Sequence, residues 1–171
     1  AVLSFSGCGF HLRGEVLLPS VMAKPHLDGS DLELMRRLEE ELHARGAHPA
    51  ADPAGASAVI ELLRVAYLRE VGTLDLSGTV TGYVLKYEVV YRVLGPDLEV
   101  LVDETRITLS RNLDYDRGQV LQLEQDETLL RNELVEEAVR RMLTRLMTLS
   151  AQRSARIPAG VRWLYLAESF A

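Results

Sequence analysis

The amino-acid sequence predicts an α+β fold, in which a small mixed or antiparallel sheet carries two helices packed on one face. Three segments with an extended pattern follow one another at 58–71, 79–94 and 98–111. A segment with helical periodicity lies on each side of this group, at 30–46 and 120–150. With 171 residues, of which 47% are hydrophobic and 26% charged, the chain has the length and composition of a single domain with a full core.

The segment 15–27 precedes the first helix and contains two prolines, Pro19 and Pro25, around Val21 and Met22. Proline is tolerated in sheets mainly on edge strands or at the first position of a strand. The segment is therefore predicted to be extended, with one short strand at a sheet edge whose pairing the sequence leaves open.

The first helix is predicted to follow a turn at Asp28 and Gly29. Ser30 and Glu33 have the spacing of a capping box, in which each side chain accepts from the other residue's backbone N–H. Gly46 is the expected stop, at the C′ position. The apolar face of this helix is expected to consist of Leu34, Met35, Leu38 and Leu42.

The three long strands are predicted to form a meander. A loop rich in Ala, Pro and Gly at 47–57 leads into the first strand, at 58–71, and Gly95-Pro96-Asp97 forms the turn before the last. The middle strand, at 79–94, alternates most clearly, and the last is expected at 98–111. The core face of the middle strand is expected to hold Tyr83, Leu85, Tyr87, Val89, Tyr91 and Val93, and that of the last strand Leu101, Thr105, Ile107 and Leu109.

The second helix is predicted from about Val120 to about Ser150, after a polar turn. Acidic side chains near its start and arginines near its end both favour this orientation of the helix dipole. Its apolar stripe is wide enough to cover one face of a sheet. The stripe consists of Leu130, Leu134, Ala138, Met142 and Leu146, flanked by Val135, Val139 and Leu143.

Cys8 is the single cysteine of the chain, and it directly follows a short apolar segment that ends in small residues. This context predicts a lipid attachment site, with 1–7 as the remnant of a secretory signal. The alternative is a free or buried thiol near the terminus. Gly9, and not Asp, follows the cysteine, which by analogy with bacterial lipoproteins favours the outer membrane.

Composition and motifs argue against several other classes of protein. The net charge is −6 and the sequence contains no dense Lys/Arg tract, so nucleic acid is not expected as a partner. No apolar run is long enough for a spanning helix, so membrane attachment is expected through Cys8 alone. The sequence has no nucleophile elbow, His-Glu-x-x-His motif or P-loop, so neither an enzyme nor a cofactor is predicted. No metal is assigned to His11, His26, His43 or His48, and the adjacent pairs Asp103 with Glu104 and Glu136 with Glu137 are expected to be surface charge.

The run from Cys8 to Gly14, followed at a short interval by Leu18-Pro19, resembles the mature start of the LPS-assembly lipoprotein LptE family. The predicted order of strands and helices agrees with that family. The resemblance implies one lipoprotein domain at 8–151, with a C-terminal tail at 152–171 whose role the sequence leaves open. It also implies an outer-membrane lipoprotein at the periplasmic face that plugs the LptD barrel, assists its assembly and supports delivery of lipopolysaccharide to the outer leaflet. The alternative is a free-standing periplasmic lipid-binding lipoprotein that needs no barrel partner.

The resemblance directs attention to the turn between the first two long strands. Its tip, at Leu74, Leu76, Ser77 and Gly78, is the expected contact with the barrel partner. The alternative is a plain glycine-rich hairpin turn without a binding role.

Lipopolysaccharide contact in the family involves basic residues near this hairpin and just before the long helix. In this chain Leu76 and Leu123 stand at those points, so the basic residues cannot be carried over. Strand cations are the other candidates for the anionic phosphates, and the alternative is a solvated or barrel-facing sheet surface with ordinary salt bridges. These cations are Lys86, Arg92, Arg106 and Arg111.

Overall fold

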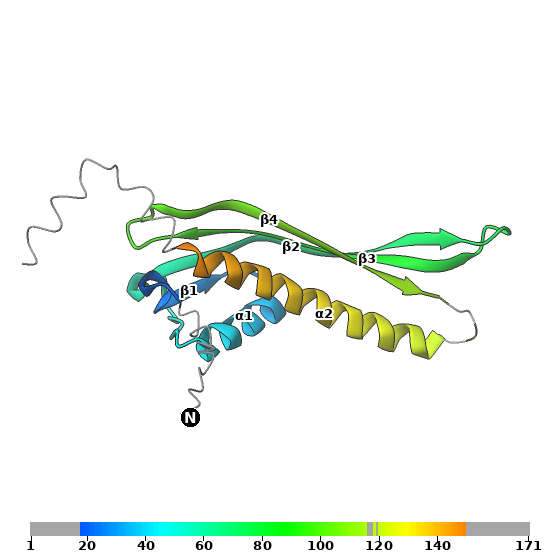
Figure 1. Cartoon of the computed structure of the whole chain (residues 1–171), viewed down its shortest axis with the longest axis horizontal. Coiled ribbons are helices and arrows are strands. Elements are labelled where there is room, and N and C mark those ends of the chain that lie inside the picture. The colour runs from blue at the N-terminus through cyan, green and yellow to red at the C-terminus, as the bar shows by residue number, and fades with distance from the viewer. Residues whose placement is uncertain (1–17, 116–117, 119, 150–171) are drawn as a thin grey trace, which may run out of the picture.

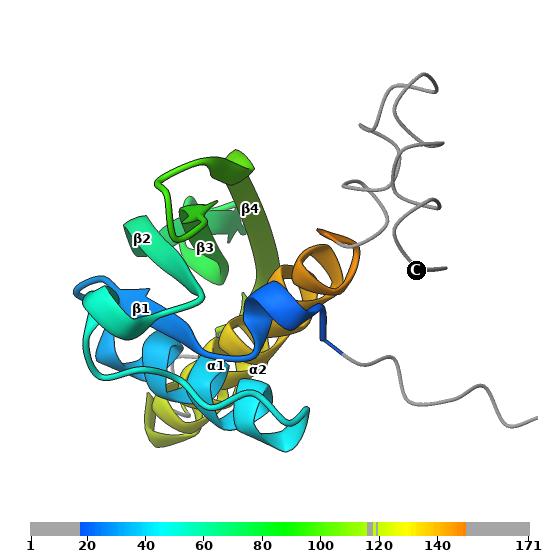
Figure 2. The same ribbon diagram turned by 90° about the vertical axis from the view of Figure 1, so that its left-hand side faces the viewer.

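The computed structural model describes residues 18–115, 118 and 120–149, and it has two layers. A long sheet forms one layer, and both α-helices lie along the same face of it, as Figures 1 and 2 show. The predicted lipidation site at Cys8, the signal remnant at 1–7 and the C-terminal tail at 152–171 lie outside the described residues. The α+β class and the packing of two helices on one sheet face are confirmed.

The strands are β1 (Pro25–Asp28), β2 (Ala58–Leu74), β3 (Val80–Leu94) and β4 (Val100–Asp114), and they lie in this order across the sheet. β2, β3 and β4 pair antiparallel, which confirms the predicted meander. β1 pairs with β2 in parallel, so the sheet is mixed. A parallel pair needs a crossover connection, and α1 (Leu32–Ala44) supplies it.

The core lies between the sheet and the two helices. The inward side chains of β3 alternate as predicted, and the apolar stripe of α2 (Val120–Met147) covers them. Leu134 is the first buried residue along the described part of α2. The largest fully buried side chains are Tyr91, Met22, Leu34, Leu38, Leu42, Ile60, Leu85, Leu134, Met142, Leu143, Leu146 and Val89.

The N-terminal part of the described chain contains the predicted short edge strand, but Val21 and Met22 do not belong to it. Val21 and Met22 belong to the short 3-10 helix η1 (Ser20–Met22), and the strand comes later, at β1. Met22 is fully buried, so the apolar pattern reflected a core contact and not a strand. β1 begins with Pro25, at the first strand position, where its missing N–H costs no ladder bond inside the strand.

The cap of α1 also differs from the prediction. Asp31 is the N-cap residue, and its carboxylate accepts from the Leu34 backbone N–H at 2.8 Å. Ser30 stands one position too early for the capping box. The helix end is as expected, because Gly46 follows it with φ of +82°, a conformation that glycine adopts without a steric cost.

The predicted phase of β4 holds over only part of the strand. Ile107 and Leu109 are buried as expected, but Val102 is buried where Leu101 was predicted. The β3–β4 register shifts between the pair Tyr91/Thr105 and the pair Val93/Val102. An irregularity of this kind adds a residue to one strand and reverses which side chains face the core.

The molecule is elongated and its two ends differ (Figure 1). We call the end that holds β1, η1 and the C-terminal end of α2 the proximal end. The distal end holds the β2–β3 hairpin tip, 68–81, and the N-terminal part of α2, 120–132. The short 3-10 helix η2 (Pro53–Gly55) lies in the connection that leads from α1 to the proximal end of β2.

Candidate functional site

The β2–β3 hairpin tip is a compact turn organised by Asp75. Its carboxylate accepts from the backbone N–H groups of Ser77 and Thr79 at 2.8 and 2.9 Å, and from the Ser77 hydroxyl at 2.6 Å. The Asp75 N–H donates to the Thr79 carbonyl, and the Gly78 N–H donates to the Asp75 carbonyl. Gly78 has φ of +79°. The tip therefore has a defined shape that its own side chains provide.

Apolar side chains are exposed around this turn. Leu76 has a relative exposure of 111%, and Leu74 one of 58%, so neither belongs to the core. Leu68 and Val71, earlier in β2, are also more than half exposed. The predicted contact residues Leu74, Leu76, Ser77 and Gly78 are thus brought together at the end of a projecting hairpin (Figure 1). Such a cluster is available to a partner surface.

Three of the four predicted lipopolysaccharide cations lie on the outer face of the sheet, away from the helices. Lys86 contacts Glu70 at 2.6 Å, and Arg106 contacts Glu88 at 3.1 Å. Arg92 pairs with Glu61 directly across the β2–β3 ladder. The ion pair with Glu61 raises the pKa of Arg92. Each of these cations already has a carboxylate partner.

Arg111, the fourth predicted cation, lies on the opposite face of the sheet. Its guanidinium reaches Glu133 of α2 at 3.8 Å, across the layer interface. The structure therefore does not gather the four cations into one site.

A polar cluster joins the distal half of the sheet to α2. The Tyr67 hydroxyl donates to one oxygen of the Glu127 carboxylate at 2.9 Å, and Arg69 contacts the other oxygen at 2.6 Å. Arg131 lies over the Tyr67 ring and also contacts Glu33 of α1 at 3.3 Å. Burial raises the pKa of Tyr67 to about 12, and the hydrogen bond to Glu127 adds to that shift. This cluster fixes α2 against β2 beyond the apolar core.

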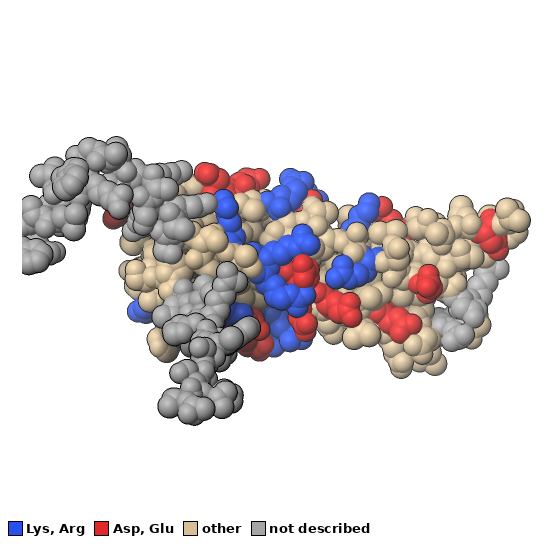
Figure 3. All heavy atoms as spheres, viewed as in Figure 1, with Lys and Arg blue, Asp and Glu red and all other residues tan. Residues whose placement is uncertain are grey.

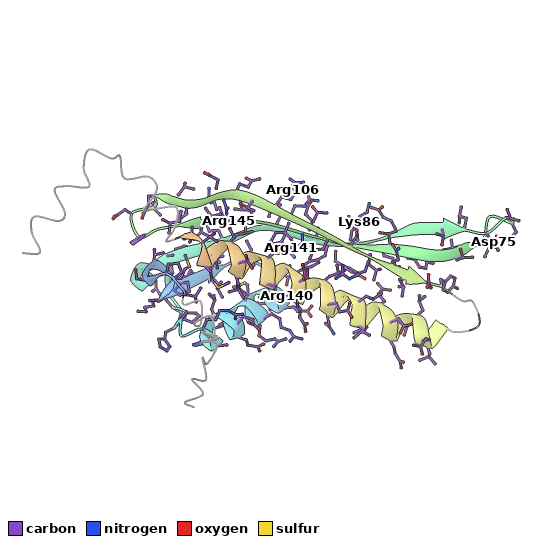
Figure 4. All side chains as sticks on the ribbon, viewed as in Figure 1. Asp75, Lys86, Arg106, Arg140, Arg141 and Arg145 are labelled. Carbon is purple, nitrogen blue, oxygen red and sulfur yellow. The ribbon has the colours of Figure 1, made fainter. Side chains whose placement is uncertain are left out.

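A second group of cations, which the sequence suggested only as dipole partners, lies on the exposed side of α2. Figure 3 shows Lys and Arg gathered in a band across the molecule, and Figure 4 labels Arg140, Arg141 and Arg145 in that region. Arg140 and Arg141 share a single carboxylate, that of Glu137, at 2.6 and 2.9 Å. Their hydrogen bonds lower the pKa of Glu137. The signal in the sequence was the clustering of arginines without acids near the helix end.

None of the described histidines lies in a cluster of side chains that could hold a metal ion. His26 bonds the Ala50 carbonyl through Nδ1 at 2.9 Å, and the rings of His43 and His48 meet edge to face at 6.0 Å. His11 lies outside the described residues. Within the described part of the chain, no group of three or more His, Cys, Asp or Glu side chains is placed to hold a metal ion. None of the helices in that part combines the length and the apolar character needed to cross a membrane.

The fold and these surfaces define a class of protein, an elongated two-layer α+β domain whose candidate functional residues lie on exposed ends and faces. Comparison with known proteins identifies the family. The model of the family described as LptE, lipopolysaccharide-assembly, matches residues 18–146. The chain belongs to the LptE family of lipopolysaccharide-assembly lipoproteins, and this membership supports a role in lipopolysaccharide transport at the cell envelope.

Individual relatives agree with this assignment. The LPS-assembly lipoprotein LptE of Photorhabdus laumondii is 25% identical over 150 residues, covering 86% of this chain and 81% of that protein. An uncharacterized lipoprotein B from Nitrosomonas europaea has a similar solution structure, with a TM-score of 0.71 and 25% identity over 91% of this chain and 96% of that one. Rare lipoprotein B from Shewanella oneidensis shares the fold, with a TM-score of 0.66 and 24% identity over 77% of this chain and 98% of that one.

Proposed function

We propose that this chain is an outer-membrane lipoprotein, attached through Cys8 at the periplasmic face, that plugs the LptD barrel and assists its assembly. In this role it supports delivery of lipopolysaccharide to the outer leaflet and catalyses no reaction. The observation that carries the proposal is the distal hairpin tip, which presents Leu74 and Leu76 to solvent on a turn of defined shape.

The exposure of these leucines argues for a binding role. An exposed leucine adds nothing to the core of its own domain, whereas a cluster at a projecting end can bury apolar area against a partner. The Asp75 bonds hold the turn in one conformation before contact, which lowers the entropy lost on binding.

Lipopolysaccharide contact through the strand cations is the secondary part of the proposal. Lys86, Arg92 and Arg106 line the outer sheet face, while Arg111 reaches Glu133 on the other side. A phosphate that binds these cations must compete with carboxylates that already contact them. Contact with the barrel is therefore the part of the function to test first.

Charge insertion at the tip tests the barrel contact. Leu76→Asp is expected to reduce capture of the LptD barrel, in detergent extracts analysed by mass spectrometry, at least roughly tenfold, because a buried unpaired carboxylate is strongly unfavourable. The melting temperature should change little, since Leu76 is fully exposed. Leu98→Asp is the matched control, because Leu98 is a 74% exposed leucine in the β3–β4 turn at the other end of the sheet.

Equal loss of barrel capture and melting temperature would instead identify the tip as an ordinary turn. If the wild-type chain is recovered as an isolated acylated monomer, with no stoichiometric barrel protein, the proposal fails in favour of a free-standing lipid-binding lipoprotein.

The attachment site has a separate test. Cys8→Ala is expected to release the chain from the membrane fraction while leaving the fold and part of the barrel affinity intact, because the anchor acts through local concentration. Circular dichroism and membrane fractionation measure the two effects. Loss of folding in this variant would contradict the anchor role.

A further inference from the structure

Charge is divided sharply along α2. Its first part, 120–137, holds six acidic residues and one arginine, whereas 138–149 holds three arginines and no acidic residue. Arg140, Arg141 and Arg145 are all exposed. We call these three residues the arginine patch.

The helix dipole does not account for the whole patch. Its effect on side chains falls off within the last turn of a helix. Arg145 lies in the last turn of α2, but Arg140 and Arg141 stand further back, since the helix ends at Met147. The dipole therefore accounts for Arg145 but not for Arg140 and Arg141, which share the carboxylate of Glu137.

Carboxylates within the domain do not neutralise the patch. Glu137 alone serves both Arg140 and Arg141. Among the described residues, Arg145 and Lys24 are the cations without an ion pair, and all the others contact a carboxylate within 4.0 Å. Both belong to the proximal part of the molecule, so positive charge is left over at this end.

The position of the patch relates it to the proposed lipid attachment. The C-terminal end of α2 lies beside η1 in both Figure 1 and Figure 2, and η1 stands two residues after the first described residue, Leu18. Cys8 precedes Leu18 by ten residues. Ten residues of chain span at most about 35 Å, even when fully extended. A lipid on Cys8 therefore holds the proximal end close to the bilayer surface.

We propose that the arginine patch binds the anionic phospholipid headgroups of the membrane in which the lipid anchor sits. This inference rests on the proposed attachment through Cys8. Arg is suited to the task because its planar guanidinium binds phosphate oxygens in a bidentate manner. A basic surface beside an acyl anchor strengthens membrane binding and orients the domain. The arginine patch then holds the proximal end at the bilayer surface.

Vesicle sedimentation of the full-length chain carrying Cys8→Ser tests the patch without the contribution of the acyl chains. Phosphatidylethanolamine vesicles with phosphatidylglycerol provide the anionic surface, and phosphatidylcholine vesicles provide the neutral one. Each basic side chain near an anionic surface strengthens binding about fivefold. The triple variant Arg140→Gln, Arg141→Gln and Arg145→Gln is therefore expected to bind the anionic vesicles at least roughly tenfold more weakly.

A matched control removes three arginines elsewhere. The variant Arg36→Gln, Arg37→Gln and Arg64→Gln changes the net charge equally, at solvent-accessible residues on α1 and the outer sheet face. It is expected to bind within about twofold of the parent chain if position, and not total charge, decides binding. Arg145→Gln alone, which breaks no ion pair, should weaken binding about fivefold and covers the case in which the triple variant misfolds.

Several results would overturn the inference. These are equal binding of the triple variant and the parent chain, equal binding to anionic and neutral vesicles, and equal weakening by the control variant. Displacement from the vesicles by inorganic phosphate, but not by chloride at the same ionic strength, would identify a simple phosphate site. Binding only to vesicles that contain lipopolysaccharide would mean that the patch binds lipopolysaccharide and not phospholipid headgroups.

Measuring capture of the LptD barrel distinguishes failure of this inference from failure of the proposed function. The triple variant, with Cys8 restored, is expected to capture LptD as the wild type does, because the patch lies well away from the hairpin tip (Figure 4). Loss of vesicle binding with intact capture supports the inference. Absence of barrel capture in the wild type would end the plug proposal and leave the vesicle result unaffected.

Discussion

The two ends of β2 show how differently the proximal and distal parts of this molecule are built. At the proximal end Ala58, Ile60 and Leu62 are buried, whereas every residue from 68 to 74 is exposed. The strand continues and stays paired with β3, but the helices no longer cover it in the same way. Secondary structure alone therefore does not tell which part of the strand supports the fold.

The same contrast runs along α2. Leu130, on the apolar stripe of its first part, is only partly buried, whereas Leu134, one turn further along the same face, is fully buried. The distal part of the helix is held by the polar cluster around Glu127, and the proximal part by apolar packing. The comparison indicates that the proximal end provides most of the stability, and that the distal end is free to present a binding surface.

The largest expected effect comes from a pair of leucines on the two sides of this boundary. Leu134→Ala should lower the free energy of unfolding by about 3 kcal/mol, because it leaves a cavity in a closely packed core. Leu130→Ala, four residues earlier on the same apolar face, should lower it by about 1 kcal/mol, because Leu130 is only partly buried. Denaturant unfolding measures both values. Similar losses for the two variants would show that the distal half of α2 is also part of the stabilising core.

A smaller effect is expected at the two hairpin turns, which have the same hydrogen-bond pattern at opposite ends of the sheet. One turn runs from Asp75 to Thr79 and the other from Gly95 to Glu99. In each, the carbonyl of the first residue accepts from the N–H of the fourth, and the N–H of the first donates to the carbonyl of the fifth. The fourth residue is Gly78 in the distal turn, with φ of +79°, and Leu98 in the proximal turn, with φ of +60°. A left-handed conformation costs a residue with a Cβ roughly 1 to 2 kcal/mol.

Exchanging glycine between these turns sharpens the comparison. Gly78→Ala should cost about 1 kcal/mol of local stability, visible as faster amide exchange at the tip with little change in global unfolding. Leu98→Gly should raise global stability by about 0.5 kcal/mol, since relief of strain exceeds the added freedom of the unfolded chain. A large global loss in Gly78→Ala would contradict the independence of the distal tip.

Much of the fold could be predicted because local pattern and final burial agree. The alternation of β3 and the stripe of α2 from Leu134 onward each follow the period of their own element. The phase change in β4 could not be predicted, because it depends on the register with β3 and not on the β4 sequence. The partial burial of Leu130 was hidden for a similar reason, since Leu130 continues the stripe and only the extent of the core separates it from Leu134.

The candidate site, too, could be predicted from the sequence only in part. Exposure of Leu76 follows from its place in a turn, so the hairpin tip could be located from sequence. The partners of the strand cations could not, because Glu61 meets Arg92 only through the β2–β3 register. The arginine patch was visible in the sequence, but its role beyond the helix dipole could be inferred only from its shared carboxylate and from the position of the C-terminal end of α2 beside η1.

The smallest expected effect concerns the polar cluster that joins the two parts. Tyr67→Phe removes the hydrogen bond to Glu127 and should cost about 0.5 kcal/mol at neutral pH, because the group is only partly buried and Glu127 keeps Arg69. At high pH the wild-type chain should also lose stability because the Tyr67 phenol ionises. The pKa of Tyr67 is about 12 in the folded state, above the ordinary value near 10 of the unfolded chain.

The sign of this pH effect follows from the raised pKa. The contribution of Tyr67 is fully present below the unfolded pKa and is lost as pH rises through the folded pKa, because the unfolded chain releases its phenolic proton first. Burial also raises the pKa of Tyr87 and Tyr91. The Tyr67→Phe variant should therefore still lose some stability as the pH rises, because these two tyrosines remain. Unfolding curves at rising pH should therefore converge for Tyr67→Phe and the wild type, since only the wild type has this phenol to ionise. Parallel curves would mean that Tyr67 ionises alike in both states, and that the cluster around Glu127 does not hold the distal part of α2 to the sheet.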